Sequence, residues 1–208
     1  MTSPTVNSIG RLTEKRKQYE LRGLGLRDFA GLSGDRPLDP FALARFAKLM
    51  VVDFDSIKGL SAESRRHLLG AATNEWSGGA CSRLLPNGWR IVILNPAHGL
   101  HRNRATLMEE VAHVFLGHRP NRLAETASPG ATINAKTAAR DYNKADEEAA
   151  YAIGAAALVP YEALHRMVNQ GKSGNEIARH FRVSRQLIEY RIKVTHLWSN
   201  YKRASEHI

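Results

Sequence analysis

Two adjacent glutamates and a nearby histidine, Glu109, Glu110 and His113, are the residues whose types and spacing best suit chemistry in this chain. Positions i and i+4 share one face of an α-helix, so Glu109 and His113 can hold one ion between them. Carboxylate oxygens and imidazole nitrogens are both zinc ligands in proteins. Glu110, next to the first ligand, is placed to act as a general base on metal-activated water. The stretch therefore predicts a hydrolytic metal site.

The pattern E-E-x-x-H differs from the zinc-protease motif H-E-x-x-H at its first position, where Glu109 replaces a histidine. A Glu-His-Glu site is harder and more anionic than a His-His-Glu site, so it should hold zinc less tightly and admit manganese or iron. The extra negative charge should also make the bound water less acidic. Two interpretations stay open, namely a variant site that works with Zn²⁺ or Mn²⁺ and a degenerate site without a metal.

The helix predicted to carry these residues, over about 103–116, is apolar on most of its surface. Its apolar positions are Leu107, Met108, Val111, Ala112, Val114 and Phe115. Such a helix is expected to be buried, where two carboxylates and an imidazole are costly unless they are paired or bind a metal. The alternative is an exposed pair of glutamates with His113 near the helix C-terminus.

Three further histidines, His98, His101 and His118, flank this helix. The five-residue step from His113 to His118 corresponds to about 140° around a regular helix, off the ligand face unless the helix ends first. We expect all three to be structural or exposed to solvent.

A second helix, predicted over 146–158, begins with Asp146, Glu147 and Glu148 and continues with Ala and Gly, which allow close packing on another helix. Acidic residues in a first turn interact favourably with the helix dipole. They can also supply a further metal ligand, and the two roles are compatible.

The remaining patterns predict an α+β chain that is mostly helical with a small β-sheet. A charged helix is expected over 11–22, followed by a turn-like segment over 23–37 and a helix started by Asp39-Pro40. A short strand over 51–54, a helix capped by Ser61, and a hairpin of strands 80–85 and 89–95 follow. Residues 119–140 are expected to form a long loop, and helices are expected over 161–169, 174–181 and 184–201.

The C-terminal part is strongly basic. Nine Lys or Arg and two Glu lie between residues 165 and 203, a net charge of +7 out of +10 for the chain. Residues 174–192 resemble a helix-turn-helix, in which Arg185, Gln186 and Arg191 could reach bases or phosphates. The alternative is a helical pair that packs on the core, with its basic face in solvent.

Between Asp39 and Val159 the chain resembles the ImmA/IrrE family of metallopeptidases, also described as the IrrE N-terminal-like domain. The resemblance rests on the Asp39-Pro40 start, the strand ending in Asn95-Pro96, the segment 104–118, the Tyr142-Asn143 pair and the acidic helix ending in Pro160. It implies a zincin-like domain over 39–160, an N-terminal helical extension over 1–38 and basic C-terminal helices over 161–208. Known members cleave or control transcriptional repressors.

Carried over by position, the resemblance implies that Glu110 is the general base and that His113 is a zinc ligand, with Glu109 in the place of the other ligand on that helix. It makes Glu147 the third ligand, in the first acid position of the family's E-x-E-A pattern. Ala149 stands where a second Glu is frequent in that pattern, so Glu148 is a rival ligand.

Length and composition limit the number of domains, the disulfides and the cellular location that we expect for this chain. The 208 residues suit one domain, alone or with a small appendage, and the single cysteine, Cys81, cannot form an internal disulfide. Neither a signal peptide nor an apolar run of about 20 residues is present, so we expect a cytoplasmic protein without a membrane partner. Three functions remain: a metal-dependent endopeptidase acting on a protein such as a repressor, a non-catalytic relative that binds a protein, and a DNA-binding regulator.

Overall fold

The structure, a computed structural model, describes residues 12–118 and 143–205. The loop predicted over 119–140 therefore lies outside the described residues. In chain order the elements are α1 (Glu14–Phe29), α2 (Pro40–Phe46), β1 (Leu49–Val52), the short 3-10 helix η2 (Phe54–Ser56), α3 (Ala62–Leu69), β2 (Gly78–Leu84), β3 (Arg90–Leu94), α4 (Leu100–Phe115), α5 (Lys144–Leu158), α6 (Tyr161–Asn169), α7 (Gly174–Phe181), α8 (Arg185–Val194) and α9 (Trp198–Ser205).

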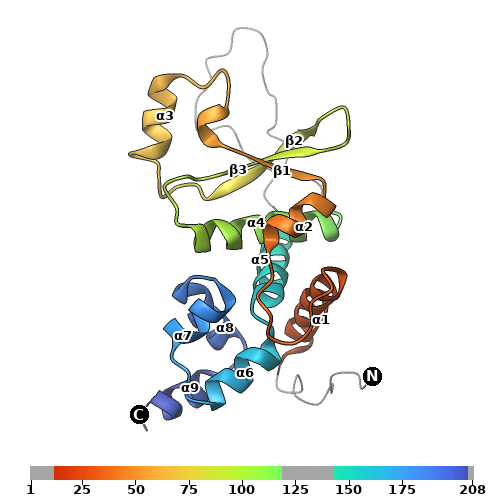
Figure 1. Cartoon of the computed structure of the whole chain (residues 1–208), viewed down its shortest axis with the longest axis vertical. Helices are drawn as coiled ribbons and strands as arrows, with labels where there is room; N and C mark the ends of the chain where they lie inside the picture. Colours follow the sequence, from red (N-terminus) through yellow and green to blue (C-terminus); the bar gives the residue numbers. More distant parts are fainter. Residues whose placement is uncertain (1–11, 119–142, 206–208) are drawn as a thin grey trace.

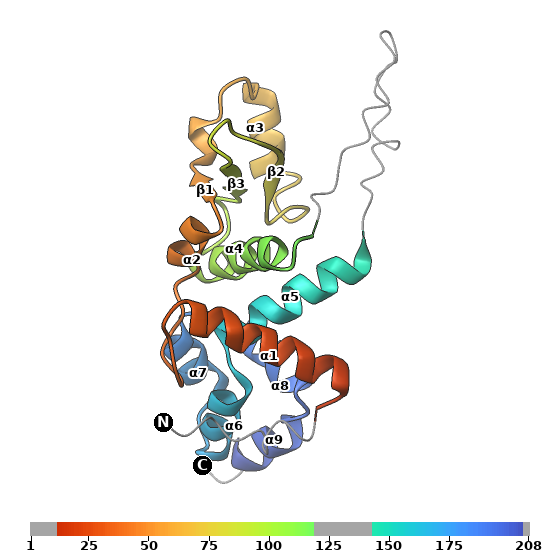
Figure 2. The ribbon, with the colours of Figure 1, turned by 90° about the vertical axis from the view of Figure 1, so that its right-hand side faces the viewer.

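The elements form a stack along the long axis of the molecule (Figure 1). The sheet and α3 lie at one end, α6 to α9 lie at the other, and α1, α4 and α5 lie between them. A view turned by 90° shows α1 crossing beside α4 and α5 (Figure 2). One continuous apolar core runs through the stack, from Leu49 and Val92 in the sheet to Ile188 in α8 and Leu197 just before α9.

The sheet has three strands in the order β1-β3-β2. β1 pairs in parallel with β3, and β2 pairs with β3 in the antiparallel direction of a hairpin. The hairpin turn, predicted from Pro86-Asn87-Gly88, closes with Gly88 at a φ of +78°, a conformation that glycine adopts without steric cost. The expected α+β class, mostly helical with a small sheet, is confirmed.

The start of α2 is fixed as the sequence predicts, and it anchors α4. The Asp39 side chain accepts a hydrogen bond from Phe41 N at 3.1 Å, and Pro40 occupies the first turn. Arg104 of α4, only 7% exposed, donates to the Leu38 carbonyl and lies 3.4 Å from Asp39 Oδ1. A buried guanidinium thus ties α4 to the residues that precede α2.

The helix predicted over 11–22 extends to Phe29, so the expectation of a turn-like segment from Gly23 is wrong for residues 23–29. The glycine allows close contact between helices rather than a turn. A Cβ atom built on Gly23 would lie 2.7 Å from Ala156 Cβ and 2.8 Å from Ala157 N on α5. Propensity disfavours glycine within a helix, but here the tertiary contact outweighs it.

The helix predicted over 184–201 is divided, because α8 ends at Val194 and α9 starts at Trp198. His196 adopts a φ of +59° between them, which a regular helix cannot contain. A buried ion pair attaches α8 to the rest of the molecule, since Arg191 Nη2 donates to Glu20 Oε2 of α1 at 2.6 Å. Glu20 also accepts from Tyr161 N, and Arg191 donates to the Val159 carbonyl, so this pair joins α1, the α5–α6 junction and α8.

Candidate metal centre

The α4 helix places its polar residues next to a fully buried apolar face. Leu107, Met108, Val111 and Ala112 have no exposed surface. Glu109, Glu110 and His113 lie at the margin of that face and are half-buried. Carboxylates and an imidazole therefore lie beside a buried helix face, as expected, whereas the apolar residues Val114 and Phe115 at the end of α4 are exposed.

The α5 helix approaches α4 closely enough to add a third polar group. Asn143 caps α5 by accepting hydrogen bonds from Ala145 N and Asp146 N. Further along, a Cβ built on Gly154 would lie 3.2 Å from the Met108 carbonyl oxygen and 3.4 Å from Glu109 N. The small residue lets the two backbones approach one another.

Glu109, His113 and Glu147 meet between these two helices. Each offers one ligand atom within 4.8 Å of the others, and His113 Nε2 lies 3.5 Å from Glu147 Oε2. Two ligands at about 2.1 Å on a tetrahedral zinc ion are roughly 3.4 Å apart, so small side-chain rotations would bring the three atoms to that spacing. The donor set of two carboxylates and an imidazole suits zinc or manganese.

The electrostatics of Glu109 favour a cation in this position. Burial raises the pKa of the Glu109 carboxyl to about 8, and the neighbouring carboxylates Glu110 and Glu147 act in the same direction. Glu109 forms no hydrogen bond or ion pair with another described residue. Without a metal the group therefore keeps a proton at neutral pH, and a metal ion would supply the positive charge instead.

His113 is suited to act as a neutral ligand. Burial lowers its pKa, and His118 lowers it too, while Glu147 opposes that shift. A deprotonated ring nitrogen is what a metal requires.

The rival ligand, Glu148, lies on a different side of α5. Its carboxylate accepts a hydrogen bond from Lys15 Nζ of α1 at 2.9 Å, and this contact lowers its pKa. It is not a member of the group formed by Glu109, His113 and Glu147.

His118 lies against His113, because α4 ends at Phe115. The two Nδ1 atoms are 3.0 Å apart, and His118 Nε2 is 3.5 Å from Asp146 Oδ1 of α5. A helix that continued would have carried His118 away from this position. Gly117, two residues after the last helical residue, was the signal that could have revealed the change of direction. His98 is half-buried ahead of α4 and His101 is exposed, and neither joins the group.

Tyr151 is a further residue near the group that the sequence patterns do not single out. It lies one helical turn after Glu147 on α5, and its ring contacts Tyr190 of α8 with centroids 4.9 Å apart. Burial raises the pKa of its phenol to about 12, and Tyr190 and Glu109 act in the same direction. The phenol is therefore protonated at neutral pH.

The three candidate nucleic-acid residues occupy different environments. Arg185 and Gln186 are exposed at the start of α8, where Arg185 pairs with Glu189 at 2.7 Å. Arg191 is 4% exposed and engaged with Glu20, so its guanidinium faces the core rather than a duplex. The contact that buries it comes from a residue 171 positions earlier.

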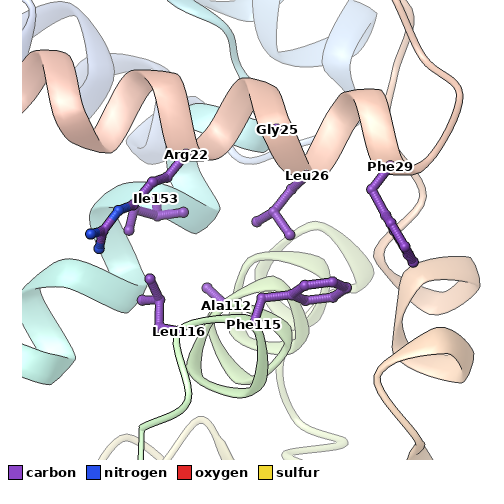
Figure 3. A pocket seen from close by; sticks show the side chains of 8 residues that line it. All are labelled: Arg22, Gly25, Leu26, Phe29, Ala112, Phe115, Leu116 and Ile153. Carbon is purple, nitrogen blue, oxygen red and sulfur yellow. The ribbon is translucent and has the colours of Figure 1, made fainter.

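An apolar groove of about 490 Å³ lies beside the end of α4 (Figure 3). Its apolar lining consists of Leu26, Phe29, Ala112, Phe115, Leu116 and Ile153, from α1, α4 and α5. Phe29 and Phe115 are 54% and 40% exposed, with ring centroids 5.2 Å apart. Arg22 is the charged member of the lining, and it forms no hydrogen bond or ion pair with another described residue.

Comparison with protein-family models gives a match to the IrrE N-terminal-like domain, Peptidase_M78, over residues 77–193. This range exceeds half of the 208 residues and extends from β2 into α8. A search among curated proteins found no match. Among the described residues, no helix combines the length and apolarity that a membrane crossing needs.

Proposed function

The chain belongs to the IrrE N-terminal-like domain family of peptidases, and on this premise we propose that it is a metal-dependent endopeptidase acting on a protein partner such as a transcriptional repressor. The observation that carries the proposal is the convergence of Glu109, His113 and Glu147 within 4.8 Å, around a half-buried carboxyl that lacks a partner among the described residues.

In this proposal Glu109, His113 and Glu147 would hold Zn²⁺ or Mn²⁺. The ion, when bound, polarises a peptide carbonyl and acidifies water. Glu110 accepts the proton of the attacking water and passes it to the leaving amine, since it neighbours Glu109 on α4 and its negative charge acts on the same site. The half-buried α4–α5 contact limits the access of bulk water and strengthens these interactions.

The groove of Figure 3 supports a protein rather than a small polar molecule as the substrate. Its walls include Ala112, which directly precedes His113 in the sequence, and Phe115, two residues after it. Exposed apolar surface of this kind marks a binding site, and Arg22 adds one positive charge. A substrate segment with a large apolar side chain next to a carboxylate would complement both features.

Metal binding and peptide cleavage, measured on five versions of the protein, test the proposal. Wild type should bind about one zinc or manganese per chain, His113→Ala and Glu147→Gln should lose it, and Glu148→Gln should keep it as the matched control. Glu110→Gln should keep the metal and lose cleavage of a peptide library analysed by mass spectrometry. A wild type that binds neither metal would refute the proposal and favour a degenerate relative that works by binding.

DNA binding is a second candidate function, because α7 and α8 form a helical pair with Arg182, Arg185 and Gln186 exposed around the turn. Ser184 caps α8 here by accepting a hydrogen bond from Leu187 N. In this case Arg185→Ala should weaken DNA binding and reduce its salt dependence. Unchanged binding of a DNA duplex by that variant would remove this candidate.

A further inference from the structure

The return of His118 toward His113 is produced by the way in which α4 ends. Gly117 adopts a φ of +68°, His118 N donates to the His113 carbonyl at 3.0 Å, and Gly117 N donates to the Val114 carbonyl at 3.1 Å. These two bonds form a Schellman motif, with glycine in the left-handed conformation just after the helix. The motif usually brings two apolar side chains together across the helix end, but here it joins two imidazoles.

The distances define a chain of four groups that extends across the α4–α5 contact. Glu147 Oε2 is 3.5 Å from His113 Nε2, His113 Nδ1 is 3.0 Å from His118 Nδ1, and His118 Nε2 is 3.5 Å from Asp146 Oδ1. A neutral imidazole has one donor and one acceptor nitrogen, so the tautomer of one ring determines that of the other.

A metal ligand at His113 Nε2 leaves Nδ1 of that ring as the donor. His118 Nδ1 must then accept, which places the proton of His118 on Nε2, facing the Asp146 carboxylate. With a metal ion held between His113 Nε2 and Glu147 Oε2, every member of the chain has a complementary partner in this arrangement. With the opposite tautomers, His113 Nε2 carries a proton that faces Glu147 and cannot bind a metal, and His118 Nε2 presents a lone pair to the Asp146 carboxylate. The arrangement of the side chains therefore matches His113 as an Nε2 ligand.

We propose that His118 and Asp146 are positioning residues that hold His113 in the tautomer and ring orientation that a metal ligand requires. The proposal rests on the proposed function, because it concerns the same centre. Outer partners of this kind, from a carboxylate through an imidazole to the ligand, tune metal affinity without touching the metal.

The zinc affinities of three variants, His118→Phe, His118→Gln and His101→Phe, test this role. His118→Phe should weaken zinc binding by about 10- to 100-fold, which is the usual effect of removing an outer-shell partner. His118→Gln should recover most of the affinity, because its amide oxygen can accept from His113 and its amide nitrogen can donate to Asp146. His101→Phe, at an exposed histidine at the start of α4, should bind zinc as wild type does. Thermal unfolding in the presence of a chelator checks that each variant folds.

Histidine nitrogen NMR of the zinc-loaded wild type gives a second readout that a merely structural role would not move. His118 should carry its proton on Nε2, with Nδ1 unprotonated. Protonation on Nδ1, or zinc affinity of His118→Phe equal to wild type, would overturn this inference and leave the proposed function standing. Absence of zinc binding by the wild type would overturn both.

Discussion

Glu109→Gln should change how the stability of the metal-free protein depends on pH. Burial raises the pKa of Glu109 from 4.5 to about 8, a rise of about 3.5. A pKa difference of one corresponds to about 1.4 kcal/mol, so ionising this group in the folded state costs up to about 5 kcal/mol. The unfolded chain releases the proton near pH 4.5, and the folded protein holds it until about pH 8.

The direction in which stability changes with pH follows from the number of protons that the folded and unfolded states bind. Between about pH 4.5 and pH 8 the folded state binds more protons than the unfolded state, so rising pH favours unfolding. The loss of folding stability is complete above about pH 8. Glutamine resembles the protonated carboxyl and does not titrate. The free energy of unfolding of Glu109→Gln minus that of wild type should therefore grow by several kcal/mol from about pH 5 to pH 8.5.

Urea denaturation of both proteins in the presence of a chelator, at intervals across that range, measures this difference. Added zinc should abolish the loss of stability that wild type shows at high pH, because the ion replaces the proton on Glu109. Zinc should have a smaller effect on the stability of the glutamine variant. A difference that changes by less than about 1 kcal/mol across the range would mean that Glu109 is solvated, which would refute the reasoning that this carboxyl calls for a cation.

Three further predictions concern the framework of the site and the groove. Arg191→Ala should lower the free energy of unfolding by about 3–5 kcal/mol in urea denaturation, because it leaves Glu20 buried and unpaired, and a loss below about 1 kcal/mol would contradict that role. Gly23→Ala should lower the melting temperature, because the new methyl group meets Ala156 at 2.7 Å. Gly25→Ala should raise the melting temperature through about 1 kcal/mol of helix propensity, since nothing lies within 4 Å of its Cβ. Gly25→Trp should fill the groove and reduce peptide cleavage while leaving zinc affinity unchanged, and wild-type cleavage by that variant would exclude the groove as a substrate site.

The helices that carry the candidate centre could be predicted from local patterns. The spacing of Glu109 and His113, the apolar positions around them and the acidic start of α5 are all properties of short segments. The preference for Glu147 over Glu148 came from the family resemblance and not from the local pattern, because it depends on the angle at which α5 crosses α4. Gly154 at that crossing is recognisable as a close contact only once the partner helix is known.

Other features depended on residues far apart in the sequence. Arg191 looked like one more charge in a basic segment, because nothing nearby indicates that Glu20 lies beside it. Gly23 suggested a turn for the same reason, as its contact is with Ala156. The position of His118 was the exception, because Gly117 is a local signal for the end of a helix, and weighing it would have changed the expected direction of the chain.

The contacts of α1 also determine when this helix can pack on its partners during translation. α1 leaves the ribosome before its partners, since Lys15 pairs with Glu148, 133 residues later, and Glu20 pairs with Arg191, 171 residues later. At translation rates of roughly 5–20 residues per second, this delay lasts on the order of 10–30 seconds. Until α5 has emerged, the part of α1 around Gly23 has no native surface to pack against, so this part of the nascent chain is open to a chaperone that shields exposed apolar segments.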